Sequence, residues 1–290
     1  MAKGDESSSP PFRTQLLKWV GNKQRFAGEI VATFPAIEVG NTYFEPFLGS
    51  GAVLGTLAPQ TAIASDAFQP LVGIWQCLQE DPTRLTQWYK TRWDRFNNAG
   101  EPRAVYAEIR ESYNQHPNAA DLLFLSRSCY GGVVRFRQRD GHMSTPCGPH
   151  KPITPESFAK RVSIWRERTE GAKFEHMDYR EAIAMASAGD VIYCDPPYVD
   201  TQKILYGAQQ FQLAELLQSI TEAKARGAFV ALSIDGTKKS GSKLCDVVIP
   251  PGLFGRELAV NVGRSMLRRF QMQGRSLEAE VVRDRLLLTD

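Results

Sequence analysis

Short apolar runs alternate with glycine turns and amphipathic segments at both ends of the chain, but not in its middle. Residues 41–78 predict a strand, a glycine turn, a helix, a second strand and a second helix, which is the order of a βαβ unit. In the last third, 173–178, 190–198 and 228–235 predict strands, and 212–227 predicts a helix. Both ends are therefore expected to contribute to one α/β sheet.

The middle of the chain has a different pattern. Residues 81–126 are polar and aromatic with helical spacing, and a helix is predicted again over 154–169. Between them, 127–152 is rich in glycine, proline and arginine, as a hairpin or loop would be. We interpret the middle as a lobe inserted into the sheet domain.

Composition narrows the class of protein. The chain has 290 residues, of which 42% are hydrophobic and 23% charged, as in a soluble globular protein. Its apolar runs are too short to span a membrane. Residues 1–12 contain no apolar signal core, so we expect a short disordered tail and no secretion. The five cysteines show no pairing pattern, which favours reduced thiols in a cytosol.

Charge is unevenly distributed along the chain. The net charge is only +3, but residues 127–173 hold ten Lys/Arg against four Asp/Glu, while 81–126 balances at six of each sign. A basic segment in a near-neutral chain can face the phosphates of a nucleic acid. A solvated helix face is the alternative.

The first chemical signal is the glycine turn FEPFLGSGAV at 44–53. Gly49 and Gly51 lie between a predicted strand and a predicted helix, where glycine lets the backbone approach a ligand at the carboxyl edge of the sheet. A tight turn without a ligand is the alternative. Asp66 ends the next predicted strand and is placed to bind ribose hydroxyls. The turn lacks Gly-Lys-Ser/Thr, so a nucleoside triphosphate site has no support.

The second chemical signal is Asp195-Pro196-Pro197-Tyr198, the last four residues of the run VIYCDPPY. Asp195 and the carbonyl of Pro196 could accept the two N–H groups of a planar exocyclic amine and draw its nitrogen toward a tetrahedral, nucleophilic state. Proline restricts φ and so aims that carbonyl in advance. Tyr198 supplies a ring on which a base that has left the duplex could stack. The alternative is a rigid turn after a strand.

Three motifs in this order resemble the Dam-type (D12) class of DNA adenine-N6 methyltransferases. They are LLKWVGNK at 16–23, FEPFLGSGAV at 44–53 and YCDPPY at 193–198, and the resemblance covers nearly the whole chain. Related amino-methyltransferases usually carry Ser before Pro-Pro when the target is cytosine N4, and Asn when it is a protein glutamine. Asp195 therefore favours adenine.

The resemblance implies a fold and a domain organisation. The fold is an α/β, Rossmann-like methyltransferase sheet with an inserted helical and β-hairpin DNA-recognition lobe. Residues 126–148 resemble the family's DNA-reading hairpin, and 264–290 resemble its terminal strands. The expected domains are a disordered tail at 1–12, a catalytic domain that binds S-adenosylmethionine at 13–79 and 166–290, and a target-recognition domain at 80–165.

The resemblance also implies roles for single residues. The catalytic set is Asp195, Pro196, Pro197 and Tyr198. The S-adenosylmethionine pocket includes Trp19, Gly21, Lys23, Glu45, Phe47, Gly49, Gly51, Asp66 and Asp178. In it, Lys23 would pair with the cofactor's carboxylate and Asp178 would accept from its adenine amine. The alternatives are that Lys23 is an ordinary surface lysine and that Asp178 is an acid in the turn after a strand.

DNA contacts are implied for the basic lobe and the segment before the pocket. They involve Lys18, Arg127, Tyr130, Arg135, Arg137 and Arg139. Tyr130 resembles an aromatic wedge that enters the base stack. Arg135 resembles an arginine that reads guanine in the major groove, with a phosphate contact as the alternative.

The family pattern changes within the recognition segment. The asparagines usual in the family are replaced by Gly131, Arg137 and Ser144, and Gln210 stands near the place of a histidine. These changes leave the methylation chemistry intact. They concern the recognition sequence, for which GATC is the family's commonest target.

Other interpretations stay open at this point. Cys129, His142, Cys147 and His150 could be drawn as a zinc site, although their spacings do not match a standard finger. The alternative enzymatic activities are methylation of cytosine N4 or of an RNA adenine. A protein of a different class, a DNA-binding relative without catalytic activity, is the other alternative.

Partners and location follow from the resemblance. We expect duplex DNA as the partner, no metal and no membrane, and a monomer with a weak dimer on DNA as the alternative. The expected place is the cytoplasm of a bacterial, archaeal or phage-infected cell. An enzyme paired with a restriction nuclease, a solitary enzyme and a phage-borne one all fit the sequence.

Overall fold

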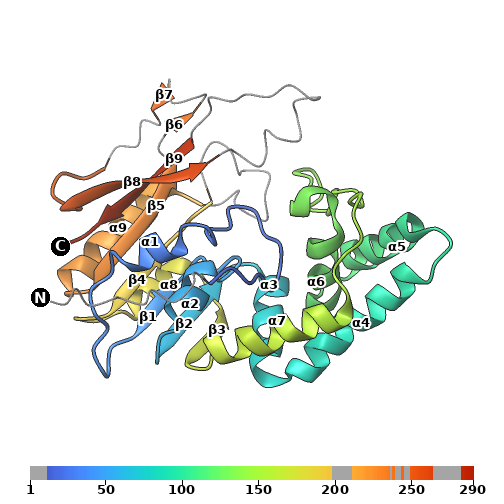
Figure 1. Ribbon diagram of the computed structural model, residues 1–290. Coiled ribbons are helices and arrows are strands. Elements are labelled where there is room, and N and C mark those ends of the chain that lie inside the picture. Colours follow the sequence, from blue (N-terminus) through green and yellow to red (C-terminus); the bar gives the residue numbers. More distant parts are fainter. Residues whose placement is uncertain (1–11, 198–210, 236, 239–242, 245–248, 264–281) are drawn as a thin grey trace, which may run out of the picture.

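A seven-stranded sheet forms one side of the molecule, with the strand order β3-β2-β1-β4-β5-β9-β8 (Figure 1). The computed structural model describes residues 12–197, 211–235, 237–238, 243–244, 249–263 and 282–290. The strands from β3 to β5 run parallel, while β9 is antiparallel to both of its neighbours. The connections change direction between β1 and β4, which is the switch point of a doubly wound sheet. The predicted Rossmann-like α/β class is confirmed.

The strands come from both ends of the chain, as predicted. Their bounds are β1 Tyr43–Glu45, β2 Ala62–Asp66, β3 Ala172–His176, β4 Val191–Cys194, β5 Phe229–Asp235, β8 Arg256–Gly263 and β9 Val282–Leu288. A separate pair consists of β6 Thr237–Lys238 and β7 Lys243–Leu244. All four side chains of β4 are buried because a central parallel strand is covered on both faces.

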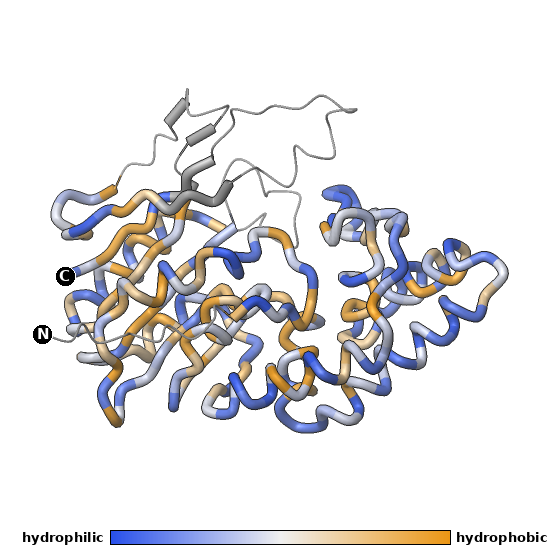
Figure 2. Tube along the Cα trace, in the orientation of Figure 1, coloured by the Kyte–Doolittle hydropathy of each residue, from blue (hydrophilic) through white to orange (hydrophobic). Residues whose placement is uncertain are grey.

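Helices cover both faces of the sheet and form two hydrophobic clusters. Alternate strand residues enter different clusters: Tyr43 and Tyr193 belong to one, Phe44 and Ile192 to the other. The helices near the sheet are α1 Ala27–Val31, α2 Ala52–Leu57, α3 Gln69–Glu80, α8 Tyr179–Ala184 and α9 Leu213–Ala225. Hydrophobic residues are concentrated along the central strands in Figure 2.

The middle of the chain forms a helical lobe beside the sheet (Figure 1). Its helices are α4 Pro82–Asn97, α5 Pro102–Gln115, α6 Ala119–Ser128 and α7 Pro155–Arg168. Three of the helix starts have a local cause, because the side chains of Asp81, Asn118 and Thr154 accept hydrogen bonds from backbone N–H groups of the first turn. The lobe contacts the sheet domain through Trp165 of α7, whose ring meets Trp75 of α3 edge-on.

A loose hairpin connects α6 to α7. It contains a 3-10 turn at Tyr130–Gly132 and two isolated bridges, Cys129 to Cys147 and Phe136 to Met143. The hairpin was predicted for 127–152, but α6 extends through Ser128, so the basic segment begins inside a helix.

Some predictions concern parts of the chain that the structure does not describe. Tyr198, Gln210 and most of the tail at 1–12 lie outside the described residues. Of the expected terminal strands at 264–290, β9 is described, and β8 ends just before that range. None of the helices in the described ranges combines the length and the apolar character that a membrane span requires.

Candidate active site

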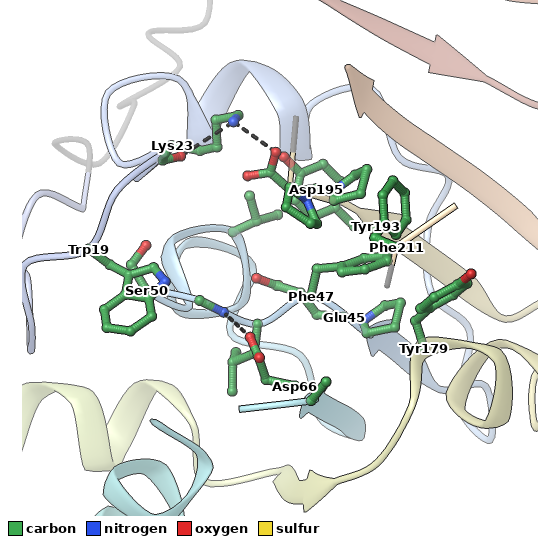
Figure 3. Close-up of a pocket in the computed structure, with 18 of the residues that line it drawn as sticks. Trp19, Lys23, Glu45, Phe47, Ser50, Asp66, Tyr179, Tyr193, Asp195 and Phe211 are labelled. Carbon is green, nitrogen blue, oxygen red and sulfur yellow. Dashed lines mark hydrogen bonds and ion pairs between the residues drawn. The ribbon is translucent and has the colours of Figure 1, made fainter. Parts of the chain in front are cut away.

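A cavity of about 200 Å³ lies at the carboxyl edge of β1, β2 and β4 (Figure 3). This edge is the switch point of the sheet, where ligands bind in doubly wound folds. Its lining includes eight of the nine residues predicted for the cofactor, namely Trp19, Gly21, Lys23, Glu45, Phe47, Gly49, Asp66 and Asp178. The ninth, Gly51, lies at the start of α2, and Asp195, Pro196 and Pro197 join the lining from the end of β4. The structure thus brings residues of all three sequence motifs into one site.

The glycine turn between β1 and α2 is constrained by backbone conformation and by packing. Gly49 and Gly51 have φ angles of 48° and 63°, in the left-handed region that favours glycine. A Cβ atom on Gly51 would lie 2.9 Å from the Trp75 ring, and one on Gly49 would lie 3.2 Å from the Trp19 ring. The Trp75 indole also donates a hydrogen bond to the Gly49 carbonyl, at 3.2 Å. The turn is therefore rigid where it borders the cavity.

Asp66 ties this turn to the end of β2. Its carboxylate accepts one hydrogen bond from the Gly49 N–H at 3.1 Å and another from the Phe68 N–H at 3.0 Å. Burial raises the pKa of Asp66 to about 6, against the opposite effect of these backbone donors. Each carboxylate oxygen has a second lone pair, so Asp66 can accept further hydrogen bonds from a ligand in the cavity.

Glu45 is the most deeply buried acid in the cavity wall. Its side chain is 2% exposed and accepts a hydrogen bond from the Tyr43 hydroxyl at 2.6 Å. Burial, with a smaller contribution from the charge of Asp195, raises the pKa of Glu45 to about 8 against the lowering effect of the Tyr43 hydroxyl. Glu45 is therefore mostly protonated at neutral pH unless a cation enters the cavity.

We predict that Glu45→Gln changes how stability depends on pH. The unfolded chain loses this proton near pH 4.5, whereas the folded chain holds it to about pH 8. The stability that Glu45 contributes is therefore complete below pH 4.5 and is lost as pH rises through 8. Relative to the wild type, Glu45→Gln should gain stability between pH 5 and pH 9, on the order of 4 kcal/mol.

Urea unfolding at pH 5, 7 and 9 measures this difference. Glu29→Gln is the control, because Glu29 is an exposed glutamate on α1. Parallel curves for Glu45→Gln and the wild type would show that Glu45 titrates normally.

Lys23 and Asp195 form an ion pair that joins the segment before α1 to the end of β4. The Lys23 ammonium lies 2.8 Å from an Asp195 carboxylate oxygen, and it also donates to the Gly21 carbonyl at 3.3 Å (Figure 3). The sequence alone predicts separate roles for these residues, with Lys23 at the cofactor and Asp195 at the target base. The ammonium orients Asp195, because it donates a hydrogen bond to one oxygen of the carboxylate.

Asp178 caps α8 and is held by Arg180. Its carboxylate accepts from the Arg180 backbone N–H at 2.9 Å and from the guanidinium at 2.8 and 3.1 Å. The same guanidinium donates to Glu215 at 2.9 Å. These bonds hold the pKa of Asp178 below its usual value, so the acid stays an acceptor at the cavity rim.

Three aromatic rings form the end of the cavity opposite Trp19 (Figure 3). Phe47 stacks on Tyr179 with ring centroids 5.2 Å apart, and Phe211 meets both rings edge-on. Tyr179 and Phe211 were not predicted as site residues. Their one sequence signal is position, since Tyr179 follows Asp178 directly and Phe211 follows the Pro-Pro motif within the same connection.

Most residues predicted for DNA binding surround the turn after α6. Tyr130 is 38% exposed, and Arg139 is also exposed. Arg137 and Arg139 pair with Asp140 at 2.9 and 3.2 Å. The Arg135 backbone is held by Thr145 and Ser144, and in the described part of the chain no side chain pairs with its guanidinium.

Lys18 and Arg127 have different environments. Lys18 is exposed, and its stem packs against Gly132, where a Cβ atom would lie 2.9 Å from it. This places Lys18 beside the Tyr130 turn. Arg127 is 5% exposed and donates to backbone carbonyls of the N-terminal segment. Its expected contact with DNA is not supported, because α6 extends through this residue and turns its side chain inward.

The alternative of a zinc site finds no geometric support. Cys129 is buried, and its backbone pairs with that of Cys147 across the hairpin. Within the described ranges, no three His, Cys, Asp or Glu side chains are grouped as they would be to hold a metal ion.

The comparisons with known proteins agree on one family. The D12 class N6 adenine-specific DNA methyltransferase family matches residues 19–243. The DNA adenine methylase of Serratia marcescens is 32% identical over 185 residues, which cover 63% of this chain and 66% of that protein. The DNA N-6-adenine-methyltransferase of Escherichia phage P1 is 28% identical over 237 residues, or 78% of this chain and 30% of the phage protein.

A third relative and a solved structure extend these comparisons. The retron Ec67 DNA adenine methylase of Escherichia coli is 30% identical over 193 residues, or 64% of each chain. The chain thus spans less than two thirds of the length of these three relatives. The rRNA methyltransferase aviRa from Streptomyces viridochromogenes aligns with a TM-score of 0.36 and 17% identity over 99% of this chain and 88% of that one. Similarity at that level is too low to support a conclusion.

Proposed function

This chain belongs to the D12 class of N6 adenine-specific DNA methyltransferases, and from that premise we propose that it methylates N6 of an adenine flipped out of duplex DNA. Membership of the family implies a methyl donor of the S-adenosylmethionine type. The observation that carries the proposal is that the glycine turn, Asp66 and the Asp195-Pro196-Pro197 motif border one cavity.

The residues of the cavity fit S-adenosylmethionine. Phe47, Tyr179 and Phe211 offer apolar ring faces for its adenine, and Asp178 offers an acceptor for the adenine amine. Asp66 would accept from the ribose hydroxyls. The Lys23 ammonium would pair with the carboxylate at the methionine end. When bound, the cofactor supplies a methyl group already activated on a positively charged sulfur.

The chain's own residues then prepare the attacking nitrogen. Asp195 would accept one N–H of the target amine and the Pro196 carbonyl the other, which raises electron density on N6. Both acceptors follow the buried strand β4 directly, so their positions are fixed before the substrate arrives. Lys23 orients Asp195 through the 2.8 Å ion pair. Tyr198 would stack on the flipped base.

The inserted lobe is proposed to bind the duplex. Residues 80–165 would form the target-recognition domain, and 13–79 with 166–290 the catalytic domain. Tyr130 would enter the base stack, Arg135 would read a guanine, and Lys18, Arg137 and Arg139 would contact the backbone. The target would be GATC or a related short site.

We also propose a place and an assembly. The enzyme would act as a monomer in the cytoplasm of a bacterial, archaeal or phage-infected cell, because its substrate is found there. Support comes from the source of the relatives, which are bacteria and a bacteriophage.

A methylation assay tests the proposed function. The purified protein would be given radiolabelled S-adenosylmethionine with duplex DNA, single-stranded RNA or no nucleic acid, and the products would be digested to nucleosides. We expect N6-methyladenine from duplex DNA only. Label in N4-methylcytosine or in RNA would favour the alternative enzymatic activities, and binding of DNA without transfer would favour a non-catalytic relative.

We predict that Asp66→Asn weakens binding of S-adenosylmethionine by ~1–3 kcal/mol, because an amide leaves one of the surrounding N–H donors without an acceptor. Wild-type affinity should also fall below about pH 6, where Asp66 becomes protonated, and the variant should lose that dependence. Calorimetry at pH 5 and pH 8 measures both effects. Glu175→Gln on the neighbouring strand β3 is the control, since Glu175 is exposed, and unchanged affinity in Asp66→Asn would remove Asp66 from the site.

A further inference from the structure

Two arginines of the lobe hold one short stretch of backbone in the N-terminal segment. Arg127 of α6 donates from Nη1 to the carbonyls of Gln15 and Leu16, at 3.1 and 2.8 Å. Arg161 of α7 donates from Nη1 to the Gln15 carbonyl at 2.9 Å. Two helices of the inserted lobe therefore converge on the residues that immediately precede the cavity lining.

The setting of Arg127 is unusual for a cation. Its guanidinium is buried over the Phe158 ring, 5.9 Å from the centroid, and no carboxylate in the described residues forms an ion pair with it. Its Nε has no hydrogen-bond partner among those residues. Burial lowers the pKa of Arg127 to about 10, so the charge persists at neutral pH. A cation buried without an acid is costly, and it is compensated by the carbonyls of residues 15 and 16 and by the nearby Tyr89 hydroxyl.

The held backbone leads directly into the cavity. Trp19, three residues beyond Leu16, is 3% exposed and lies in the cavity wall. Its ring approaches the place of a Gly49 Cβ atom to 3.2 Å and lies 6.2 Å from the Phe68 ring. The position of Trp19 thus depends on how the segment before it is held.

We propose that Arg127 and Arg161 are positioning residues, which clamp the Gln15–Leu16 backbone and so hold Trp19 against the glycine turn. Cofactor affinity then depends on the inserted lobe, although neither arginine touches the cavity. This inference rests on the proposed function, because it takes S-adenosylmethionine as the occupant of the cavity.

The test compares cofactor binding and kinetics in matched variants. Arg127→Met removes the charge and two hydrogen bonds, and Arg161→Met removes one. Arg127→Lys keeps a donor that can reach a carbonyl. Arg103→Met is the control, because Arg103 is an exposed arginine on α5 of the same lobe. Affinity for S-adenosylmethionine would be measured by calorimetry without DNA, and KM and kcat by methylation of DNA.

We expect Arg127→Met to weaken cofactor binding about tenfold and to raise KM for S-adenosylmethionine by a similar factor. At saturating cofactor, kcat should stay within about threefold of the wild type. Arg161→Met should show a smaller rise in KM, Arg127→Lys should recover part of the loss, and Arg103→Met should match the wild type.

A purely structural role would give a different result. In that case KM would be unchanged, kcat would fall with the folded fraction measured by circular dichroism, and the proposal would be overturned. If Arg127→Met does not fold, Arg161→Met and Arg127→Lys test the proposal in the same way. A raised KM with a nearly unchanged kcat supports it, and an unchanged KM with a lowered kcat overturns it. A wild-type protein that neither binds the cofactor nor methylates DNA would overturn the proposed function, whereas normal wild-type activity with unchanged variants would overturn this inference alone.

Discussion

Asp195→Asn should abolish measurable methyl transfer while S-adenosylmethionine still binds within about tenfold of the wild-type affinity. The amide keeps the shape of the carboxylate but replaces one acceptor oxygen with a donor, which would face the N–H groups of the target amine. Loss of one preorganised electrostatic contact of this kind costs about 10²–10³-fold in kcat. The loss should be at least that large here, because the introduced donor repels the amine.

The ion pair with Lys23 makes the choice of variant important. Asp195→Ala leaves the buried Lys23 ammonium without its partner at 2.8 Å, so this variant combines a catalytic and a structural defect. In Asp195→Asn the amide oxygen can still accept from Lys23. We therefore expect Asp195→Ala to be less stable than Asp195→Asn, with both equally inactive.

Single-turnover methylation and calorimetry measure the two quantities separately. Asp94→Asn is the control, because Asp94 is also paired with a lysine, Lys90, but on the exposed face of α4. Turnover within tenfold of the wild type in Asp195→Asn, with the cofactor bound normally, would falsify the role of Asp195 at the target amine.

Arg135→Ala should lose discrimination at one base pair and change little elsewhere. A bidentate arginine–guanine contact contributes about 1–3 kcal/mol of discrimination. Among the described residues the Arg135 guanidinium has no side-chain partner, while its backbone is fixed on both sides by Thr145 and Ser144. Such a side chain is available to a ligand and starts from a defined position.

The two neighbouring arginines serve as internal controls. Arg137 and Arg139 share Asp140, so each carries a partly compensated charge in the hairpin. Arg139→Ala should weaken methylation of all sequences alike and reduce the salt dependence of binding by about one unit of slope. Arg137→Ala should either do the same or act at a second base pair.

Methylation rates on duplexes that carry each single base change, at two salt concentrations, distinguish these patterns. If Arg135→Ala lowers the rate uniformly on every duplex and reduces the salt slope, Arg135 contacts phosphate and does not read a base. The recognition sequence would then depend on other residues of the hairpin.

Several elements were predictable from the sequence because their causes are local. The run before Asp195 is apolar at every position, as a central parallel strand requires, and it forms β4. The starts of α4 and α7 follow from Asp81 and Thr154, which cap the first turn. The glycine turn required two left-handed residues, and Gly49 and Gly51 are the two.

Other elements could not be predicted from the sequence, for physical reasons. The helices α1 and α8 have five and six residues, fewer than two turns, so helical periodicity cannot show in them. The end of α6 was assigned to a basic loop, because arginine content says nothing about which way a side chain points. The burial of Arg127 depends on a tertiary contact, because the N-terminal segment packs against α6.

The sequence by itself determined the backbone conformations of the site, its residue types and the family, since each depends on neighbours along the chain. Tertiary structure alone decided which of these residues meet. The Lys23–Asp195 pair joins positions 172 residues apart, and the rings of Phe47, Tyr179 and Phe211 come from three separate segments of the chain. The position of β9 between β5 and β8 was likewise decided by the tertiary structure alone. Such contacts result from the order of strands in the sheet, and strand order depends on the packing of the whole core and on no single segment of the chain.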